Sequence, residues 1–272
     1  MNSTLHHKII VITGASSGIG EATAYAFAKY KCKLILAARN IVLLEKVKHK
    51  CQQLGSMATI VQCDVSNEMD CMQLMQNAEM TYGKIDVLIN NAGISMRATL
   101  EDCELAVLKQ VMDVNFWGTV YCTKFALPQL LHQKGSIIAV SSVSGLLGLP
   151  ARTGYSASKH AVDGFMQSLR IENLKRNLHV GVVYPGYTAS NIRNAALNKI
   201  GKPQAESPLD ESKLMPAYEV ANTIVEMVKK RKRQKILTFQ GHLVNFINTF
   251  FPRWVDSLVY NFVSKEKDSP FT

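Results

Sequence analysis

The sequence predicts an α/β fold in which one parallel β-sheet is covered by helices on both faces. Short apolar, β-branched runs alternate with helical segments along most of the chain. The run at residues 85–89 lacks the alternation of a half-exposed strand, as expected when both faces of a sheet are covered. The first run leads through a glycine turn directly into a helix. Together these observations predict a doubly wound parallel sheet.

The length and composition are compatible with one domain. The chain has 272 residues, of which 47% are hydrophobic, and this is enough for a sizeable core. We therefore expect a single domain over residues 1–272. The segment from Met1 to Lys8 is polar, which argues against a signal peptide or a membrane span there and favours a cytoplasmic protein.

The cysteines favour free thiols rather than a metal site. The sequence contains no Cys-x-x-Cys pair and no grouping of cysteines with histidines in a zinc-binding pattern. We therefore expect a reducing compartment and no metal. The six cysteines are Cys32, Cys51, Cys63, Cys71, Cys103 and Cys122.

The formal net charge of +10 is concentrated in one basic run. Three interpretations are open: the solvated end of a helix, which is the simplest, contact with an anionic membrane surface, and contact with nucleic acid. Because no zinc-finger or RNA-binding motif accompanies the run, we expect no nucleic-acid partner. The run consists of Lys229, Lys230, Arg231, Lys232, Arg233 and Lys235.

Strands and helices alternate through the first half of the chain. The expected strands are residues 8–12, 33–38, 58–62, 85–89 and 136–140. The expected helices are residues 19–30 and 41–54, a segment before residue 85, and a long helical region at 101–133.

A glycine turn joins the first strand to the first helix. In the run from Thr13 to Gly20, three residues separate the first two glycines and one separates the last two. Glycines let the backbone approach a phosphate closely, and the N–H groups and dipole at a helix start favour the anion. The turn therefore indicates a dinucleotide site, with an ordinary tight turn as the alternative.

Two side chains at strand ends bear on the choice of cofactor. Enzymes that bind a dinucleotide without a 2′-phosphate usually carry an acid after the second strand, but Ala38, Arg39 and Asn40 stand here. Arg39 fits a 2′-phosphate, so NADP is favoured over NAD, and an ordinary surface arginine is the alternative. Asp64, after the third strand, suits either a hydrogen bond to an adenine amine or a helix N-cap.

A serine, a tyrosine and a lysine follow the strand at 136–140. Tyr155 and Lys159 are four residues apart in a predicted helix over 155–174, so their side chains stack on one face. The ammonium is then expected to lower the pKa of the phenol from about 10 toward about 7, although burial opposes this shift. Ser142, beyond the strand, is expected to face the crevice where open α/β sheets bind ligands. An exposed helix pair is the alternative for Tyr155 and Lys159.

These residues resemble the short-chain dehydrogenase/reductase family, in its single-domain members. The match covers residues 8–186, and its motifs stand in the family's order: the glycine turn, Asn90 to Gly93, and the set of Ser142, Tyr155 and Lys159. The resemblance implies a seven-stranded Rossmann sheet and a nicotinamide dinucleotide. It also implies a homo-oligomer, a dimer or a tetramer, packed through region 101–133 and the helix at Tyr155.

The resemblance assigns roles to individual residues. Ser142, Tyr155 and Lys159 would be catalytic together with Asn115, which would shape the site through a kinked helix and order a water, while Lys159 would also bind the nicotinamide ribose. Asn90 to Gly93 would stabilise the sheet. The implied cofactor-binding residues are Gly14, Ser16, Ser17, Gly18, Ile19, Gly20, Arg39, Asp64, Val65, Asn91, Ala92, Gly93, Tyr155, Lys159, Pro185, Gly186 and Thr188.

The chain after Pro185 differs in character from the part before it. Residues 188–216 contain several prolines and no sustained apolar period, which we interpret as a lid over the substrate, with a partly disordered insertion as the alternative. Residues 217–230 predict a helix and residues 234–239 the last strand.

Residues 242–263 form a tail with an amphipathic helical pattern. Apolar side chains recur at steps of three and four, Pro252 is expected to kink or split the helix, and the tail is too polar to span a bilayer. Its apolar stripe is expected to pack on its own domain, on a partner subunit or on a membrane interface. In this respect the tail resembles family members that act on steroids or lipid-derived ketones.

The residues together predict an NADP(H)-dependent oxidoreductase that interconverts a carbonyl and a secondary alcohol. The apolar stretch 145–150 favours a hydrophobic substrate, although a core-facing loop would have the same composition. Alternatives within enzymes are a 3-oxoacyl-thioester reductase and a 3-ketosphinganine-type reductase. Outside enzymes they are a non-catalytic NADP-binding regulator and a membrane-surface scaffold that uses the basic run and the tail.

Overall fold

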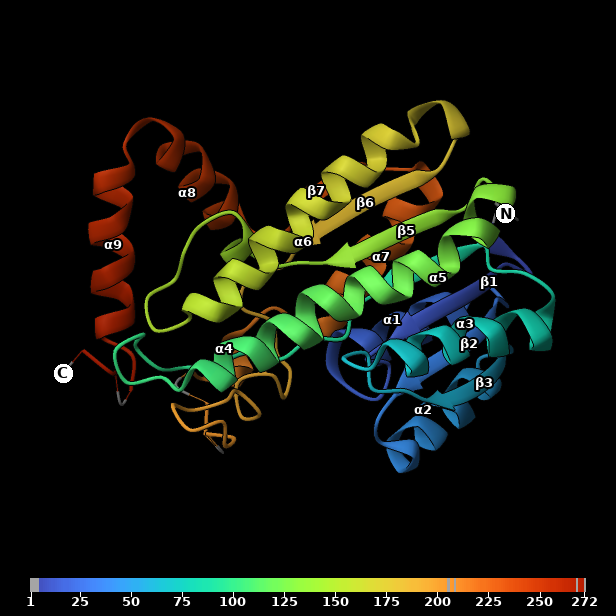
Figure 1. Ribbon diagram of the computed structural model, residues 1–272, viewed down its shortest axis with the longest axis horizontal. Helices are drawn as coiled ribbons and strands as arrows, with labels where there is room; N and C mark the ends of the chain where they lie inside the picture. Colours follow the sequence, from blue (N-terminus) through green and yellow to red (C-terminus); the bar gives the residue numbers. More distant parts are fainter. Residues whose placement is uncertain (1–4, 205, 208, 268, 272) are drawn as a thin grey trace.

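The computed structural model describes residues 5–204, 206–207, 209–267 and 269–271. A seven-stranded sheet with the order β3-β2-β1-β4-β5-β6-β7 lies at its centre, and all neighbouring strands are parallel (Figure 1). The predicted doubly wound fold is therefore confirmed. The strands are β1 Ile9–Thr13, β2 Lys33–Ala38, β3 Met57–Gln62, β4 Val87–Asn90, β5 Ser136–Val140, β6 His179–Tyr184 and β7 Gln234–Ile236.

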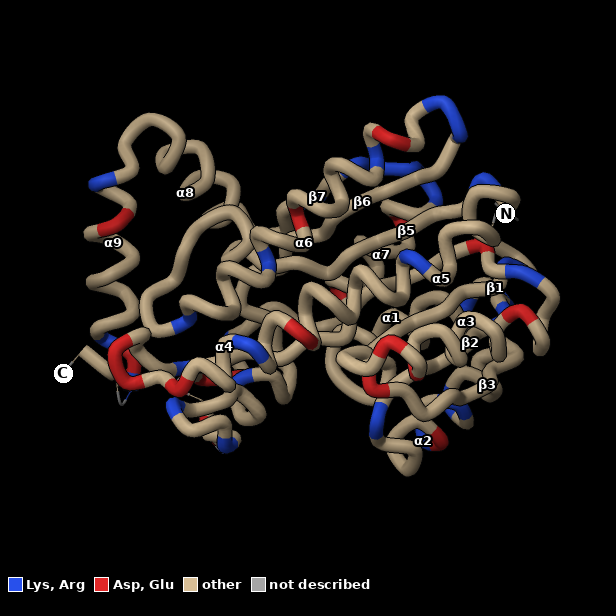
Figure 2. The backbone as a smooth tube through the Cα atoms, in the orientation of Figure 1, with Lys and Arg blue, Asp and Glu red and all other residues tan. Residues whose placement is uncertain are grey.

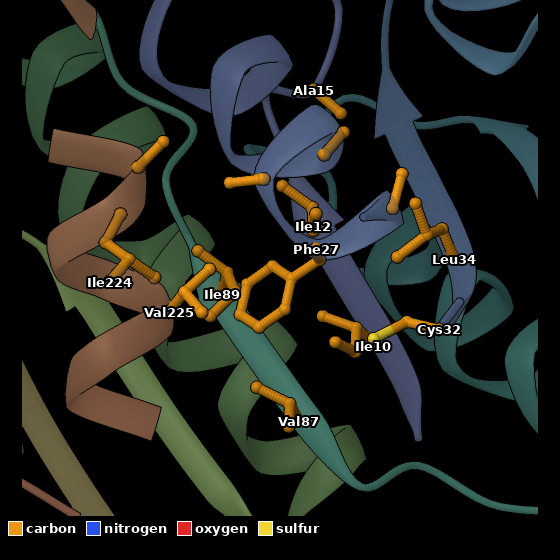
Figure 3. Packing of buried hydrophobic residues seen from close by; sticks show 14 of the residues in the cluster. Ile10, Ile12, Ala15, Phe27, Cys32, Leu34, Val87, Ile89, Ile224 and Val225 are labelled. Carbon is orange, nitrogen blue, oxygen red and sulfur yellow. The ribbon is translucent and has the colours of Figure 1, made fainter. Parts of the chain in front are cut away.

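Helices cover both faces of the sheet, because the strands are apolar on both sides. Phe27 is fully buried on one face, and Figure 3 shows its ring among side chains of β1, β4 and α7. Helices α1 Gly18–Ala28, α2 Ile41–Gln53 and α7 Ala217–Lys230 contribute to this first core. Helices α3 Glu68–Tyr82, α5 Gly118–His132 and α6 Thr153–Glu172 contribute to the second core, on the opposite face.

The long helical region predicted at 101–133 is not one helix. Helix α4 (Leu105–Met112) passes into a π-helical turn, Asp113–Trp117, before α5 begins at Gly118. A π turn carries an extra residue and bends a helix, and such turns are frequent at functional sites. The kink implied at Asn115 is therefore present.

The last strand is shorter than predicted. It ends at Ile236 rather than at residue 239, because Thr238 caps the next helix by accepting a hydrogen bond from the backbone N–H of Gly241 at 3.0 Å. The preceding strand β6 was not singled out by the sequence pattern. It pairs with β5 and β7 and ends immediately before Pro185.

The described residues of loop 188–216 are held in place rather than forming a loose insertion. Leu197 forms a β-bridge with Met96 and is buried with α4 side chains in a third apolar cluster, against which Tyr155 also packs. Arg193 donates to the carboxylate of Glu211 at 2.6 Å and 2.5 Å. The loop therefore lies against the segment that leads into α4.

The tail forms two helices, α8 Phe239–Phe250 and α9 Pro252–Ser264, so Pro252 splits the predicted helix as expected. Helix α8 leads away from the sheet and α9 returns toward α4 (Figure 1). Gly241, Val255 and Val263 are the buried residues of the two helices. Several large apolar side chains are largely exposed: Phe239, Phe246, Phe250, Phe251, Trp254, Leu258 and Phe262. Packing of the whole stripe on its own domain is therefore wrong for the chain as described.

The basic run and the tail lie at opposite ends of the strands. Because β7 is parallel to β6, the run before β7 lies where the strands begin, whereas α8 follows β7 where they end (Figure 2). Lys229 and Lys230 pair with Glu226 at 3.1 Å and 2.8 Å, and Arg231 donates to two backbone carbonyls. This arrangement favours the solvated helix end. No helix in the described part of the chain is long and apolar enough to cross a membrane.

Candidate active site

The glycine turn after β1 is fastened to the segment after β4. Gly14 has a φ of +63°, and a Cβ there would lie 2.8 Å from the Cα of Ala92. The side-chain amide of Asn91 donates to the carbonyls of Thr13 at 2.9 Å and Gly14 at 3.2 Å. Glycine is needed for both the positive φ and the close approach. The Asn-Asn-Ala-Gly motif therefore joins the two central strands at their carboxyl ends.

The start of α1 is suited to an anion. Ser17 is the N-cap residue, and among the described residues its side chain accepts no capping hydrogen bond, so the first-turn N–H groups remain available to a ligand. A Cβ on Gly20 would lie 2.2 Å from the carbonyl oxygen of Gly14, so this position excludes any side chain. Gly18, with φ +56°, faces Ser190 of the loop after β6. The predicted turn residues fit a dinucleotide phosphate.

Arg39 and Asp64 lie close together beyond β2 and β3. Arg39 Nη1 is 3.9 Å from Asp64 Oδ2, and the Arg39 side chain is 67% exposed. Asp64 is not the cap of α3, because Asn67 caps that helix by accepting from the backbone N–H groups of Met69 and Asp70. This excludes the N-cap alternative for Asp64. Val65, the next residue, is buried against Gly118.

Asn115 connects the π turn to the segment after β4 and to α6. Its side-chain oxygen accepts from the N–H of Ile94 at 2.8 Å, and its amide donates to the Ile94 carbonyl at 3.0 Å and to Ser158 Oγ at 2.9 Å. A Cβ on Gly93 would lie 3.2 Å from Asn115 Oδ1 and 3.5 Å from Lys159 Nζ. Gly93, Asn115 and Lys159 therefore meet at one point.

Tyr155 and Lys159 lie on one face of α6, as their spacing predicts. Lys159 Nζ is 5.7 Å from the centre of the Tyr155 ring and donates to the carbonyl of Val140 at 2.9 Å. Because the lysine is buried, its charged form is disfavoured and its pKa is lowered to about 8. The exposed-pair alternative is therefore wrong, since Lys159 is only 5% exposed.

The pKa of Tyr155 moves in the opposite direction to the one its spacing predicts. Burial is the largest cause and raises the pKa, because a phenolate is poorly solvated there. A hydrogen bond with Ser142 and the charges of Arg152 and Arg193 oppose this rise. The spacing of Tyr155 and Lys159 correctly predicts their proximity, but burial outweighs the attraction expected from it.

Ser142 stands two residues beyond β5, beside the phenol. In addition to its hydrogen bond with Tyr155, its oxygen accepts from the N–H of Ser144 at 3.1 Å. The apolar stretch that follows is divided between two environments. Leu146 packs against the second core and Leu147 is buried, whereas a Cβ on Gly148 would meet no described atom within 4 Å. The first part of the stretch 145–150 therefore faces the core, as the alternative predicted.

The residues just after β6 lie at the same carboxyl end of the strands as Ser142. They are Pro185, Gly186 and Thr188. The carbonyl of Pro185 accepts from the N–H of Val143 at 3.0 Å, and Thr188 Oγ1 donates to the carbonyl of Gly186 at 3.1 Å. A Cβ on Gly186 would lie 2.7 Å from a side-chain carbon of Thr238. The loop after β6 is thus fixed beside Ser142 and the start of the tail.

The site unites groups that the sequence scatters over residues 14–188. A model of the short chain dehydrogenase family matches residues 8–200. The chain belongs to this family. It is therefore an oxidoreductase that acts on CH–OH groups with a nicotinamide dinucleotide.

Relatives of this dehydrogenase include steroid-dehydrogenase-like proteins. It is 33% identical to dehydrogenase/reductase SDR family member 7B of Mus musculus, over 97% of this chain and 84% of that protein. It is 34% identical to 11-beta-hydroxysteroid dehydrogenase A of Sesamum indicum, over 93% of this chain and 75% of that protein.

Solved structures of dehydrogenases share its fold. An alcohol dehydrogenase from Thermococcus sibiricus, complexed with 5-hydroxy-NADP, is similar with 27% identity and a TM-score of 0.75, covering 85% of this chain and 95% of that one. Levodione reductase has a TM-score of 0.79 at 21% identity, over 88% and 99% of the two chains, and shows the fold alone.

Two charged residues near Tyr155 were missed by the sequence reasoning for this dehydrogenase. Arg152 stands three residues before Tyr155, so helical spacing could have indicated it. Arg193 lies in the loop after β6, and no spacing rule connects it to α6. Both positive charges favour the phenolate and so oppose the rise in the pKa of Tyr155.

Proposed function

We propose that this dehydrogenase transfers a hydride reversibly between NADP(H) and the carbonyl or secondary alcohol carbon of a hydrophobic, steroid-, lipid- or ketone-like substrate. One observation carries the proposal: Ser142 is hydrogen-bonded to the half-buried Tyr155, with Lys159 5.7 Å from the ring centre. This set lies at the carboxyl edge of the sheet, where the glycine turn fits a dinucleotide phosphate.

Each residue has a role set by its place. NADPH, when bound, supplies the hydride. Tyr155 donates a proton to the substrate oxygen, and its raised pKa keeps the phenol protonated at neutral pH, so the residue is ready for the reducing direction. Ser142 holds the same oxygen by a hydrogen bond.

Lys159 and Asn115 support this pair in the proposal. Lys159 binds the nicotinamide ribose, and its positive charge favours the negative charge that develops on the substrate oxygen. Asn115 fixes the bend between α4 and α5 through its hydrogen bonds to Ile94 and Ser158, and orders a water for proton relay. The position of Lys159 depends on that bend, because Gly93 lies between the two side chains.

The preference for NADP over NAD rests on Arg39. Its guanidinium is exposed beyond β2, and the acid that would bind ribose hydroxyls is absent from Ala38, Arg39 and Asn40. Asp64 lies 3.9 Å away and orients the arginine in the proposed site, where it also accepts from the adenine amine. The complex of the Thermococcus sibiricus dehydrogenase with 5-hydroxy-NADP supports this choice.

Titration with the two nucleotides, followed by a panel of hydrophobic ketones, tests the proposal. We expect NADPH to bind more tightly than NADH, and steroid-like ketones to oxidise bound NADPH faster than 3-oxoacyl thioesters or 3-ketosphinganine. Preference for either of the latter would instead establish the corresponding reductase. Binding of NADPH without turnover on any carbonyl would favour a non-catalytic regulator.

We also propose that the tail rests on a membrane interface. Phe246 and Trp254 are 64% and 71% exposed, and the two helices present a run of such side chains at the end of the molecule remote from the basic run. Exposed aromatic side chains on amphipathic helices favour the boundary of a bilayer. Co-sedimentation with phosphatidylcholine vesicles should persist at high salt, because apolar insertion is not screened. Loss of binding at high salt would contradict this and favour the basic run.

A homo-oligomer, a dimer or a tetramer, remains part of the proposal. Trp117 is 43% exposed at the junction of the π turn and α5, where an aromatic group with Phe116, Tyr121 and Phe165 reaches the surface. Light scattering of the purified protein gives the mass directly. A mass equal to that of one chain at micromolar concentration would contradict the proposed homo-oligomer.

A further inference from the structure

A buried carboxylate beyond α9 links the end of the chain to the candidate active site. The side chain of Glu266 is 2% exposed and accepts from Arg152 Nη2 at 3.1 Å and 2.8 Å. It also lies 3.3 Å from Arg97 Nη2. Both arginine side chains are 8% exposed, so this is a buried ionic cluster in which one carboxylate bridges two guanidinium groups.

The two arginines come from the loops that flank Tyr155. Arg97 lies in the segment between β4 and α4, and Arg152 occupies the position just before α6, three residues before Tyr155. The N–H of Ala98 donates to the carbonyl of Ala151 at 2.9 Å, which joins the two loops directly. Glu266 therefore fastens the C-terminal segment to both walls of the site at once.

A second contact of the same segment reaches the loop after β6. The ring of Phe262 stacks on Tyr187 with a centroid distance of 6.0 Å and an interplanar angle of 29°. Val263 beside it is fully buried. Residues 262–267, which we name the C-terminal latch, thus contact three segments that surround Tyr155, although they are more than a hundred positions away from Arg152 in sequence.

We propose that Glu266 is a positioning residue, which holds the C-terminal latch as the outer wall of the substrate site and thereby sets substrate affinity. This rests on the proposed function of Tyr155. Burying a carboxylate costs much free energy unless its partners are in place, so the cluster forms as a unit or opens as a unit. Without the carboxylate, two buried guanidinium groups would lose the negative charge that they share, and the attachment of the latch to both loops would be weakened, although Arg97 would still donate to the carbonyl of Lys267.

Replacement of Glu266 by glutamine tests the proposal against a matched control. Glu206→Gln removes a carboxylate that pairs with Lys267 of the same latch at 2.9 Å but is 73% exposed. We expect Glu266→Gln to raise the KM for a hydrophobic ketone about tenfold or more while kcat changes less than about threefold. The Kd for NADPH should stay within about twofold of the original, and Glu206→Gln should leave all three constants unchanged.

Hydrogen exchange supplies a readout that does not depend on turnover. In Glu266→Gln the amides of residues 252–267 should lose protection, while those of β4 and β5 keep theirs. An unchanged KM together with unchanged exchange would overturn the proposal. If the original protein reduces no ketone, the proposed function fails, but the exchange experiment still decides whether the latch exists.

A second variant covers the case in which Glu266→Gln does not fold. Phe262→Ala removes the stack on Tyr187 without leaving a buried charge unpaired, and it should raise KM in the same direction by a smaller factor. If Phe262→Ala neither raises KM nor exposes residues 252–267 to exchange, the latch is not a wall of the site.

Discussion

The site around Tyr155, at the carboxyl ends of the strands, and the two helices of the tail differ in how their side chains are contacted. At the site, Asn115 and Lys159 are buried and their polar atoms are hydrogen-bonded to neighbouring segments. In the tail, Phe246 and Trp254 project from the molecule with most of their surface exposed. Contacts within the chain fix the first region, whereas the apolar face of the second is not covered by the described part of the chain.

Removal of the phenol oxygen is the sharpest test of the first region. Tyr155→Phe should lower kcat about a thousandfold and leave the Kd for NADPH nearly unchanged, because the lost group donates the proton but is not needed to hold the nucleotide. Ketone-dependent NADPH oxidation measures the first quantity and fluorescence titration the second. Tyr218→Phe, on an exposed face of α7, is the control. Activity comparable to the original would refute the assignment of Tyr155.

Two glycine substitutions show how tightly the nucleotide turn is built. In Gly20→Ala the new Cβ would lie 2.2 Å from the Gly14 carbonyl oxygen, so the turn must shift. We expect a loss of about 3 kcal/mol in the free energy of unfolding and at least tenfold weaker NADPH binding. In Gly164→Ala, no described atom lies within 4 Å of the new Cβ, and α6 should gain about 0.5–1 kcal/mol. Urea unfolding of both variants measures these free energies. Equal free energies of unfolding for the two variants would contradict the close packing of the turn.

Much of the first region could be predicted from sequence, because its signals are local. Strands covered on both faces are continuous apolar runs, and β2, β5 and α7 have the expected bounds. The four-residue step from Tyr155 to Lys159 fixes a common face of α6. These features depend on neighbours in the chain, which the sequence displays directly.

The features that were missed depend on contacts between distant segments. No periodicity marks the π turn at Asp113–Trp117, and only the family resemblance implied a kink at Asn115. Helical spacing alone does not reveal how strongly the surroundings of Tyr155 desolvate its phenol, which reverses the direction of its pKa shift. The bridge from Glu266 to Arg152 joins positions 114 apart. The pattern of the tail predicts an amphipathic helix that Pro252 kinks or splits, but a pattern within one segment does not say what covers its apolar face.

The preference between NADPH and NADH can be tested at Arg39, an exposed residue of the first region. Arg39→Ser should weaken NADPH binding about tenfold and leave NADH binding unchanged, because only NADPH carries the 2′-phosphate that the guanidinium would contact. Lys46→Ser makes the same charge change on the exposed side of α2 and serves as the control. Equal weakening of both nucleotides in Arg39→Ser would show that its contribution is not specific to the phosphate.

The pH dependence of reduction reports on the buried lysine. Since the pKa of Lys159 is lowered to about 8, its charge is present below this pH and is lost as the pH rises through it. The raised pKa of Tyr155 keeps the phenol protonated over the same range. We therefore expect kcat/KM for ketone reduction to fall about twofold between pH 7 and pH 8, and more steeply above. Lys159→Arg, which stays charged, should flatten the profile, and a fall with the same midpoint in that variant would assign it to another group.

Substitutions in the tail should have the smallest effect on folding and thereby separate the two regions. Phe246→Ser combined with Trp254→Ser replaces two exposed rings and should change the free energy of unfolding by less than about 0.5 kcal/mol. The same variant should bind phosphatidylcholine vesicles several-fold more weakly, because the apolar area available to the bilayer is reduced. Val255→Ser is the contrast, since this side chain of α9 is 1% exposed and its replacement should cost about 1–3 kcal/mol. If the double variant were instead strongly destabilised with vesicle binding intact, the exposed rings would have a partner within the protein, such as a second copy of the chain.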